Sequence, residues 1–363
     1  MRAALALARR GLGSTWPNPS VGCVITRGGR VVGRGATAPG GRPHAETQAL
    51  AMAGGGARGA DAFVTLEPCC HHGQTPPCTD ALIAAGVACV MIGARDPDPR
   101  VNGGGAARLR AAGIGVEEGV LEAECTALNA GFFSVVRLGR PLVTLKLATT
   151  LDGRIATRAG EARWITGPAA RRAAHALRGR HDAVMVGVGT VLADDPALTC
   201  RIPGFKPVPV VRVVADSHLR TPLTSELVAT ADAAPTWILH RDGADANRIA
   251  AMQAAGVRLI AVDGQPPGID LAAGLAGLAR AGITRLLVEG GGTLAAALLR
   301  ADLVDEVAWF HAPAVMGGDG WPAAQSFGIA ELAAMPRFTR YAAYPVGEDM
   351  LTELRRSTAR EAA

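Results

Sequence analysis

Two short segments in the first quarter of the chain carry residue types that bind metals and move protons. His44 and Glu46 are separated by one residue, and Cys69 follows Pro68 directly, with Cys78 further along. One histidine and two cysteines can supply three of the four tetrahedral ligands of a catalytic zinc ion, which leaves the fourth position to water. Glu46 is then placed to act as acid and base rather than as a ligand. The combination is typical of zinc-dependent nucleobase deaminases, in which zinc activates water and a glutamate carries protons.

The spacing of the two cysteines leaves other readings open. The usual signature has two residues between its cysteines, whereas eight lie between Cys69 and Cys78. Cys70, His71 and His72 could also bind a metal, and the choice of Cys69 depends on its position after Pro68. Taken separately, the first segment is a common way to start a helix and the clustered cysteines suit a structural zinc site. Together they favour catalysis.

Composition narrows the class of substrate. The chain has 363 residues, a net charge of +5 and 4% aromatic residues, and its basic residues are scattered rather than grouped in runs. A deaminase acting on nucleic acid needs a basic groove with stacking aromatics, so we expect a small-molecule substrate and no nucleic-acid partner. A second alternative is a non-enzymatic zinc-stabilised binding module fused to a nucleotide-binding domain, in which a fourth protein ligand would close the metal site and Glu46 would be dispensable.

Several features indicate where the protein works. No apolar run is long enough to span a membrane, and the N-terminal segment lacks the pattern of a signal peptide, so we expect a cytoplasmic protein without a membrane partner. Seven cysteines, an odd number, argue against a disulfide framework.

The elements that must hold the first site alternate between strand and helix, as in an α/β sandwich. The pattern predicts helices over 2–10, 44–53, 79–85, 106–112 and 121–132, and strands over 21–25, 30–33, 62–66 and 87–93. A domain boundary is expected near 137–141, which divides the chain into 1–140 and 141–363.

The second part repeats the alternation and predicts a mainly parallel sheet with helices on both faces. Strands are expected over 142–147, 183–188, 208–214, 236–239, 258–262 and 284–288, with helices over 169–177, 271–281 and 294–299. Glycines at 290–292 follow a strand and precede a helix, an arrangement that suits phosphate binding at a helix N-terminus. A second such turn occurs at 187–190, and neither matches the Rossmann fingerprint.

Longer motifs resemble one known family over essentially the whole chain. Residues 15–22 (TWPNPSVG), 43–46 (PHAE) and 66–78 (LEPCCHHGQTPPC) resemble the deaminase half of bifunctional riboflavin-biosynthesis deaminase–reductases, in which the long cysteine spacing is normal. Residues 151–154 (LDGR), 164–167 (WITG), 194–201 (DDPALTCR) and 289–293 (EGGGT) resemble the reductase half.

The resemblance implies a cytidine-deaminase-like three-layer α/β/α domain at 1–140 and a dihydrofolate-reductase-like α/β domain at 141–363. The implied reactions are deamination of a phosphorylated diaminopyrimidinone ribosylamine, then reduction of its ribosyl group to ribityl by NADPH. One zinc ion and NADPH are therefore the expected cofactors, and a homo-oligomer built through the reductase sheet is the expected assembly.

The resemblance also implies roles for individual residues. His44, Cys69 and Cys78 would bind zinc, Glu46 would transfer protons, and Asn18, His71 and the loop of Asp96 and Asp98 would hold the first substrate. The NADPH site would include Ala148, Trp164, Thr190, Asp194, Ser217, Gly291, Gly292 and Thr293. The substrate of the reductase would contact Ala162, Arg178, Leu198, Arg201 and Glu289. Lys146, a lysine within a strand, is the candidate for the charged group beside the reacting sugar carbon.

Four positions depart from the family pattern. The family often has histidine where this chain has Thr37, a basic residue at Gln74, asparagine at Asp98 and serine at Ala162. These departures concern substrate contacts and leave the zinc ligands and Glu46 unchanged.

Overall fold

The computed structural model describes residues 1–205, 208–264 and 268–357, and it divides the chain into two compact units. The first comprises Met1–Gly139 and the second Arg140–Ala363. The division lies one residue from the expected boundary, at the glycine that ends the last helix of the first unit. Each unit has its own sheet, so each is considered by itself.

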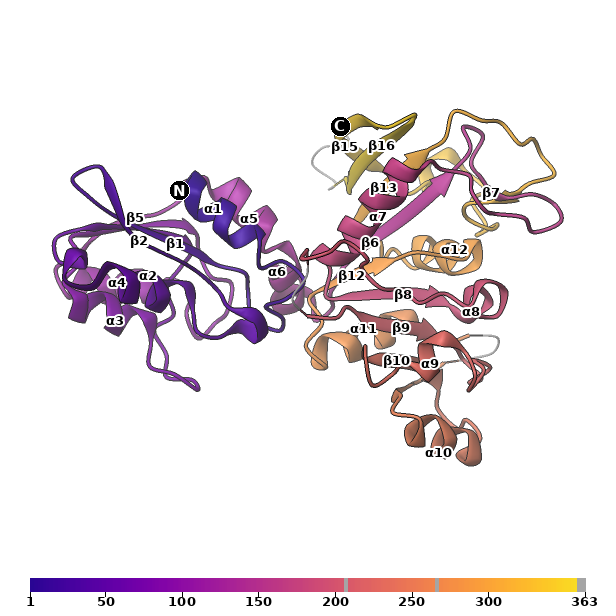
Figure 1. Ribbon diagram of the computed structural model, residues 1–363, viewed down its shortest axis with the longest axis horizontal. Coiled ribbons are helices and arrows are strands. Elements are labelled where there is room, and N and C mark those ends of the chain that lie inside the picture. Colours follow the sequence, from indigo (N-terminus) through magenta and orange to yellow (C-terminus); the bar gives the residue numbers. More distant parts are fainter. Residues whose placement is uncertain (206–207, 265–267, 358–363) are drawn as a thin grey trace. The chain divides into compact units, whose positions relative to one another are not determined.

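The first unit is a five-stranded sheet between two layers of helices (Figure 1). The strands are β1 (Gly22–Arg27), β2 (Arg30–Ala36), β3 (Asp61–Leu66), β4 (Cys89–Ala94) and β5 (Gly115–Glu117), in the order β2-β1-β3-β4-β5. Strand β1 is antiparallel to both of its neighbours, whereas β3, β4 and β5 are parallel. The helices are α1 (Arg2–Arg9), α2 (Ala45–Ala53), α3 (Cys78–Ala85), α4 (Gly104–Ala111), α5 (Glu122–Leu128) and α6 (Ala130–Leu138). Helices α1 and α5 contact each other, as do α2 with α3 and α3 with α4.

Glycines let helices lie directly on both faces of this sheet. A Cβ atom on Gly22 would lie 2.0 Å from the carbonyl oxygen of Ala4 in α1. On the neighbouring strand, a Cβ atom on Gly35 would lie 2.2 Å from the carbonyl oxygen of Ala45 in α2. Since real Cβ atoms do not approach so closely, these glycines set the depth at which the two helices pack, and α2 is the helix that carries Glu46.

One expected helix of the first unit is wrong in extent. The segment predicted as a single helix over 121–132 forms α5 and α6, with Asn129 at the junction in a non-helical conformation. The Asn129 carboxamide oxygen accepts a hydrogen bond from the backbone N–H of Ser20, 2.9 Å away. This long-range bond is made at the break between the two helices. The local apolar pattern did not reveal the break.

The second unit contains a nine-stranded sheet in the order β11-β10-β9-β8-β12-β6-β13-β16-β15. Seven strands are parallel to one another: β6 (Leu142–Thr149), β8 (Ala183–Gly187), β9 (Val211–Ala215), β10 (Thr236–Arg241), β11 (Arg258–Val262), β12 (Arg285–Val288) and β13 (Glu306–His311). The last two, β15 (Phe338–Val346) and β16 (Asp349–Arg356), are antiparallel. A two-stranded ribbon of β7 (Arg154–Ala156) and β14 (Trp321–Pro322) stands apart from this sheet.

Helices connect the parallel strands (Figure 1). They are α7 (Pro168–Arg180), α8 (Val188–Asp194), α9 (Glu226–Ala229), α10 (Ala246–Ala254), α11 (Leu271–Arg280) and α12 (Gly292–Arg300). The sequence prediction found the parallel strands up to β12 but missed β13, β15 and β16. Strand β15 is exposed along most of its length, so it lacks the apolar run or the strict alternation from which a strand is recognised.

Within residues 1–205, 208–264 and 268–357, no helix is long and apolar enough to cross a membrane.

Candidate active sites

The first candidate site is built where two helices begin beside the end of strand β3. His44 is the residue before α2, Cys78 is the first residue of α3, and Cys69 lies in the segment that follows β3. The Nδ1 atom of His44 lies 3.3 Å from the Cys78 sulfur and 3.8 Å from the Cys69 sulfur. All three ligand atoms lie within 4.8 Å of one another.

The spacing of these three atoms suits zinc. Bonds of about 2.3 Å to sulfur and about 2.0 Å to nitrogen place neighbouring donors of a tetrahedral site roughly 3.5–3.8 Å apart. The observed separations fall close to this range, and one histidine with two cysteines is a donor set that zinc accepts. Cys70 lies outside the group, with its sulfur 3.6 Å from the carbonyl oxygen of Arg100.

The protein prepares the Cys69 sulfur to act as a thiolate. Contact with the Cys78 side chain, followed by the hydrogen bond with His44, lowers the pKa of Cys69 to about 4. The backbone N–H of Cys78, at the start of α3, also donates to this sulfur at 3.3 Å. The contact with Cys69 and burial raise the pKa of Cys78. Because thiolates rather than thiols bind metals, the lowered pKa of Cys69 favours metal binding at this sulfur.

Glu46 lies in the first turn of α2, within the same buried region, and only 4% of its surface is exposed. Burial, with the charge of the Cys69 sulfur second, raises the pKa of Glu46 to about 7. A carboxyl group with such a pKa can both accept and return a proton near neutral pH. Glu46 therefore has the burial and protonation behaviour of a general acid and base.

Three of the expected substrate residues of this unit lie in loops. Asn18 lies against Gly41, where a Cβ atom would meet the Asn18 side chain. His71 follows the Cys69 segment, and its Nδ1 atom is buried without a hydrogen-bond partner among the described residues. Asp96 is buried, and its carboxylate accepts the backbone N–H of Asp98 at 2.8 Å. Burial, then the Asp98 carboxylate, raises the pKa of Asp96 to about 7.

The departures from the family pattern have different surroundings. Thr37 is buried, and its hydroxyl accepts the backbone N–H of Val21 at 2.9 Å. Gln74 is exposed. The Asp98 carboxylate is bound by the Arg100 guanidinium at 2.5–3.1 Å, which lowers the pKa of Asp98.

The second candidate site lies at the carboxyl edge of the large sheet. Strands β8 and β12 are neighbours in the sheet. From β8 the chain continues to β9 on one side of this pair, whereas from β12 it continues to β13, which lies on the other side beyond β6. Ligands of open α/β sheets bind in the crevice outside such a switch point. Helices α8 and α12 begin there, directly after β8 and β12 (Figure 1).

The glycine-rich segment brings the two helix starts together. Gly290 and Gly291 have φ angles of 158° and 76°, and a Cβ atom on Gly291 would lie 3.5 Å from the hydroxyl of Thr190 in α8. Gly292 is buried against the carbonyl oxygen of Pro322, and Thr293 is exposed. Two adjacent helix N-termini with a side-chain-free backbone form a cradle that fits the phosphates of a dinucleotide.

A charged cluster lies beside this cradle. Arg178 of α7 binds both carboxylate oxygens of Glu289, at 2.5 and 3.0 Å, and Lys146 of β6 lies 4.0 Å from the same carboxylate. Burial lowers the pKa of Lys146, an effect that Glu289 partly opposes. Burial would raise the pKa of Glu289, but Arg178 outweighs it and the pKa is lowered. Lys146, expected beside the reacting sugar carbon, therefore lies together with two of the expected substrate contacts, Arg178 and Glu289.

The segment with Leu198 and Arg201 is tied to the same helix. The Arg178 guanidinium and the His175 ring both contact the carbonyl oxygen of Thr199, at 3.0 Å each. Leu198 is buried with a φ of 50°, whereas Arg201 is exposed.

The remaining residues expected in the cofactor and substrate sites of the reductase unit lie in several separate segments. Trp164 is 67% exposed, and its ring is covered by the guanidinium of Arg171 at 4.4 Å. Arg163 links it to α8 through an ion pair of 3.5 Å with Asp194. Ala148 lies in β6, Ser217 follows β9, and Ala162 lies in the exposed segment before Trp164.

Sequence reasoning missed two residues that organise these sites. Glu67, within the first motif, is buried and accepts three backbone hydrogen bonds, as described below. His175, three residues before Arg178, contacts the 199–201 segment through its ring Nδ1 atom, 3.0 Å from the Thr199 carbonyl oxygen, and through its own carbonyl oxygen, which accepts from the Cys200 sulfur. The only sequence signal for Glu67 was a charged residue between an apolar strand and the segment of Pro68 and Cys69, and the sequence gave no signal for His175.

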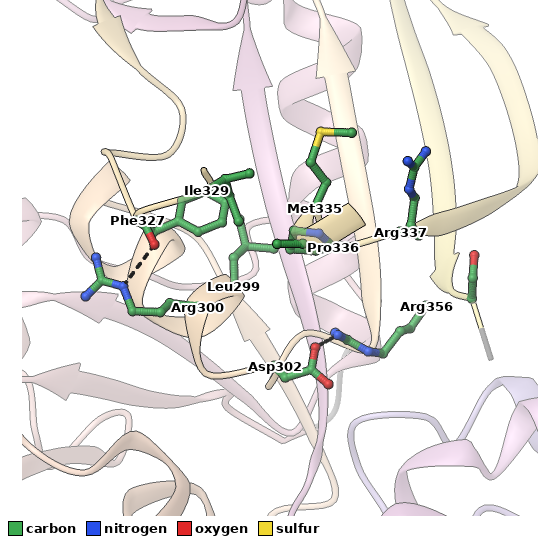
Figure 2. A pocket seen from close by; sticks show the side chains of 11 residues that line it. Leu299, Arg300, Asp302, Phe327, Ile329, Met335, Pro336, Arg337 and Arg356 are labelled. Carbon is green, nitrogen blue, oxygen red and sulfur yellow. Dashed lines mark hydrogen bonds and ion pairs between the residues drawn. The ribbon is translucent and has the colours of Figure 1, made fainter. Parts of the chain in front are cut away.

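A pocket of about 260 Å³ lies elsewhere in the second unit, near the end of α12 (Figure 2). Leu299, Phe327, Met335 and Pro336 form its apolar part, and Arg356 pairs with Asp302 at its edge. None of the residues expected in either site lines this pocket.

Two protein-family models match the chain. The cytidine and deoxycytidylate deaminase zinc-binding region matches residues 1–94, and the RibD C-terminal domain matches residues 141–352.

Curated proteins match over nearly the whole length. The riboflavin biosynthesis protein RibD of Escherichia coli (strain K12) is 42% identical over 365 residues, which cover 98% of each chain. That of Actinobacillus pleuropneumoniae is 45% identical over 318 residues, covering 88% of this chain and 84% of the relative.

Solved structures agree. Acinetobacter baumannii RibD, form 1, superposes with a TM-score of 0.88 at 36% identity, covering 99% of this chain and 98% of the other. A diaminohydroxyphosphoribosylaminopyrimidine deaminase/5-amino-6-(5-phosphoribosylamino)uracil reductase from Thermotoga maritima gives a TM-score of 0.85 at 34% identity, covering 98% and 97%.

Proposed function

The chain belongs to the RibD family of bifunctional riboflavin-biosynthesis enzymes, and from that premise we propose how its residues divide the two reactions. The expected fold class is confirmed: a cytidine-deaminase-like unit precedes a RibD reductase unit. The enzyme is a zinc-dependent deaminase and an NADPH-dependent reductase. The alternative of a nucleic-acid deaminase leaves residues 141–352, which match the reductase model, without a role.

We propose that residues 1–140 deaminate 2,5-diamino-6-(5-phosphoribosylamino)pyrimidin-4(3H)-one and that residues 141–363 reduce the resulting aminouracil. The cluster of His44, Cys69 and Cys78 carries the first assignment. When bound there, zinc supplies a Lewis acid that lowers the pKa of water. The Glu46 carboxylate would accept a proton from the attacking water and would return it to the departing amine. Its burial keeps the carboxyl group protonatable near neutral pH.

Asn18, His71 and Asp96 are proposed to hold the first substrate. His71 carries a buried ring nitrogen and Asp96 a buried carboxyl group, so both offer hydrogen-bonding groups that a bound pyrimidine or its phosphoribosyl group could engage. Thr37, Gln74 and Asp98 stand where the family often has other residues, so the contacts they make are expected to differ in detail.

In the reductase unit, we propose that the cradle of Thr190, Gly291, Gly292 and Thr293 holds the cofactor phosphates. NADPH supplies the hydride when bound. Trp164 offers a large exposed aromatic face, with Asp194 linked to it through Arg163. Ala148 and Ser217 complete the proposed cofactor site at the ends of strands β6 and β9.

Lys146 is the proposed catalytic residue of the reduction. Its buried ammonium group lies beside Glu289 and can stabilise negative charge that develops on the opened sugar. Glu289 and Arg178 are proposed to contact the substrate with Leu198 and Ala162. Arg201, exposed at the edge of this cluster, is the stronger candidate for the phosphate, because three Arg178 nitrogens already donate within the chain.

The purified chain tests both assignments at once. The zinc-loaded protein is given the diaminopyrimidine ribosylamine phosphate with and without NADPH, and ammonia release and NADPH oxidation are followed. We expect ammonia release in both samples and NADPH oxidation only after deamination. A zinc-loaded protein that releases no ammonia would contradict the first assignment.

We further propose that the enzyme works in the cytoplasm as a homo-oligomer. Both proposals rest on the family to which the chain belongs. Light scattering of the purified chain measures its mass in solution, and a mass near 37.1 kDa, that of one chain, would contradict the oligomer. Cell fractionation tests the location.

A further inference from the structure

Glu67 connects the end of strand β3 to two segments that follow much later in the chain. Its side chain is buried, with 3% of the residue exposed. One carboxylate oxygen accepts the backbone N–H groups of Asp96 and Gly103, at 3.2 and 2.9 Å. The other accepts the backbone N–H of Ala106 at 3.0 Å. All three donors belong to the stretch from the end of β4 to the first turn of α4.

Two of these bonds replace a missing helix cap. The first N–H groups of a helix have no partner within it, and a side chain just before the helix usually accepts one of them. Gly103, the residue before α4, has no side chain to do so. Glu67 supplies the acceptor from another element, and its negative charge lies at the positive end of the helix.

The start of α4 also touches the segment that carries the zinc ligand. A Cβ atom on Gly105 would lie 2.2 Å from the carbonyl oxygen of Pro68, and one on Gly104 would lie 3.1 Å from the Cys70 sulfur. The helix end therefore rests directly on the residues that flank Cys69.

The loop between β4 and α4 is consequently held at both ends by one carboxylate. The bond to Asp96 holds its beginning and the bond to Gly103 its end. Asp98 lies between them and is bound by the Asp96 carboxylate. This is the loop proposed above to hold the substrate of the deaminase.

We propose that Glu67 is a positioning residue of the deaminase, which holds the Asp96–Gly103 loop in register with the segment of Cys69. It acts on substrate binding through the loop and does not itself touch the substrate. The inference rests on the proposed function of the first unit.

Glu67→Gln tests this in the full-length, zinc-loaded chain. Glutamine has one acceptor oxygen, and its amide group would face at least one of the three N–H donors. Loss of a hydrogen bond to a charged acceptor shifts the equilibrium between the held and the released loop by about tenfold or more. We expect KM for deamination to rise about tenfold while kcat stays within about twofold, with zinc content and NADPH-dependent reduction unchanged. Amide hydrogen exchange at Asp96, Gly103 and Ala106 should become about tenfold faster.

Two further variants serve as controls. Glu67→Asp keeps the charge on a shorter side chain and should give an intermediate KM. Glu122→Gln makes the same chemical change at an exposed position in the first turn of α5 and should alter neither KM nor the exchange of the loop.

The outcomes separate this inference from the proposed function. A wild-type chain that releases no ammonia would overturn the proposed function, and this inference with it. If the wild type is active, an unchanged KM with unchanged amide exchange in Glu67→Gln would overturn the role of Glu67 alone. So would a fall in kcat that follows loss of zinc at unchanged KM, because Glu67 would then serve the metal site and not the loop.

Discussion

Arg178 and Glu289, 111 residues apart in the sequence, form a two-bond ion pair beside the glycine-rich segment of the reductase unit. Their side chains are 15% and 6% exposed, so the pair is largely desolvated. Removing one member of a buried pair leaves the other charge uncompensated. The position of the Glu289 carboxylate, and hence its distance to Lys146, depends on this arginine.

We therefore expect Arg178→Ala to destabilise the reductase unit by about 3 kcal/mol. The estimate is at the lower end for buried pairs because Lys146 still faces Glu289. Urea unfolding of the full chain, followed through signals of the second unit, measures the change. Arg172→Ala, at an exposed position of the same helix, should change stability little; an equal loss in both variants would contradict the special role of the pair.

Adjacent cysteines provide a direct test of the metal ligands. Cys69 belongs to the cluster with His44 and Cys78, whereas Cys70 does not. Cys69→Ala should reduce bound zinc from one per chain to nearly none and abolish deamination, because two protein ligands hold the ion poorly. Cys70→Ala should keep both. Metal analysis of the purified variants decides the point, and loss of zinc in Cys70→Ala would mean that the ligand set is wrong.

Glu46→Gln should lower kcat for deamination by at least about a hundredfold, since a positioned acid or base contributes this much or more. The substitution keeps the size of the side chain and removes the proton-transfer group. Zinc content should remain at one per chain and NADPH oxidation on preformed aminouracil substrate should persist. If deamination and reduction vanished together in a folded variant, the assignment of the two reactions to separate sites would fail.

The pKa values of two carboxyl groups of the first unit are shifted in opposite directions, so we expect pH to have opposite effects on their contributions to stability. The pKa of Asp96 is raised to about 7, mainly by burial, whereas that of Asp98 is lowered, mainly by its hydrogen bonds to Arg100. Between pH 4 and 7 the folded protein therefore binds a proton at Asp96 that the unfolded chain releases. The contribution of Asp96 to stability must fall as pH rises through this window. The contribution of Asp98 is present above pH 4 and is lost as pH falls below it.

To isolate these contributions, the free energy of unfolding is measured as a function of pH for the wild type, for Asp96→Asn and for Asp98→Asn. Urea unfolding, followed through signals of the Met1–Gly139 unit, gives the free energies. The difference between wild type and Asp96→Asn should decrease from pH 4 to 7, while that for Asp98→Asn should stay level. A rising difference for Asp96 would show that its pKa is not raised.

Lys146→Met should lower the rate of reduction by about a hundredfold or more and leave deamination unchanged. Methionine fills a similar volume without the charge that Lys146 places beside Glu289. Ammonia release serves as the internal control on the same sample. Full reductase activity in this variant would exclude Lys146 as the catalytic residue.

Local patterns were sufficient for much of the fold and for the first site. The residue types at His44, Cys69 and Cys78 indicated zinc, because few other uses require one histidine and two cysteines so close together. Periodicity predicted the parallel strands of the second unit up to β12, because buried strands carry continuous apolar runs. It missed the short strand β5 of the first unit. It also missed the exposed strand β15, whose side chains carry no such pattern.

Folding over long distances decided which atoms meet. The motif around Glu67 did not predict the three backbone N–H groups that donate to its carboxylate from 29 to 39 residues away. These bonds depend on how β4 and α4 pack against β3. Likewise, the sequence indicated Arg178 and Glu289 as two separate substrate contacts, and only the sheet order places them in contact with each other. Residue type and spacing indicated His44, Glu46 and a cluster of cysteines and histidines that includes Cys69 and Cys78, while Pro68 and the family resemblance selected Cys69 over Cys70. They did not indicate the packing that positions these residues, since hydrogen-bond partners and burial are properties of the folded chain.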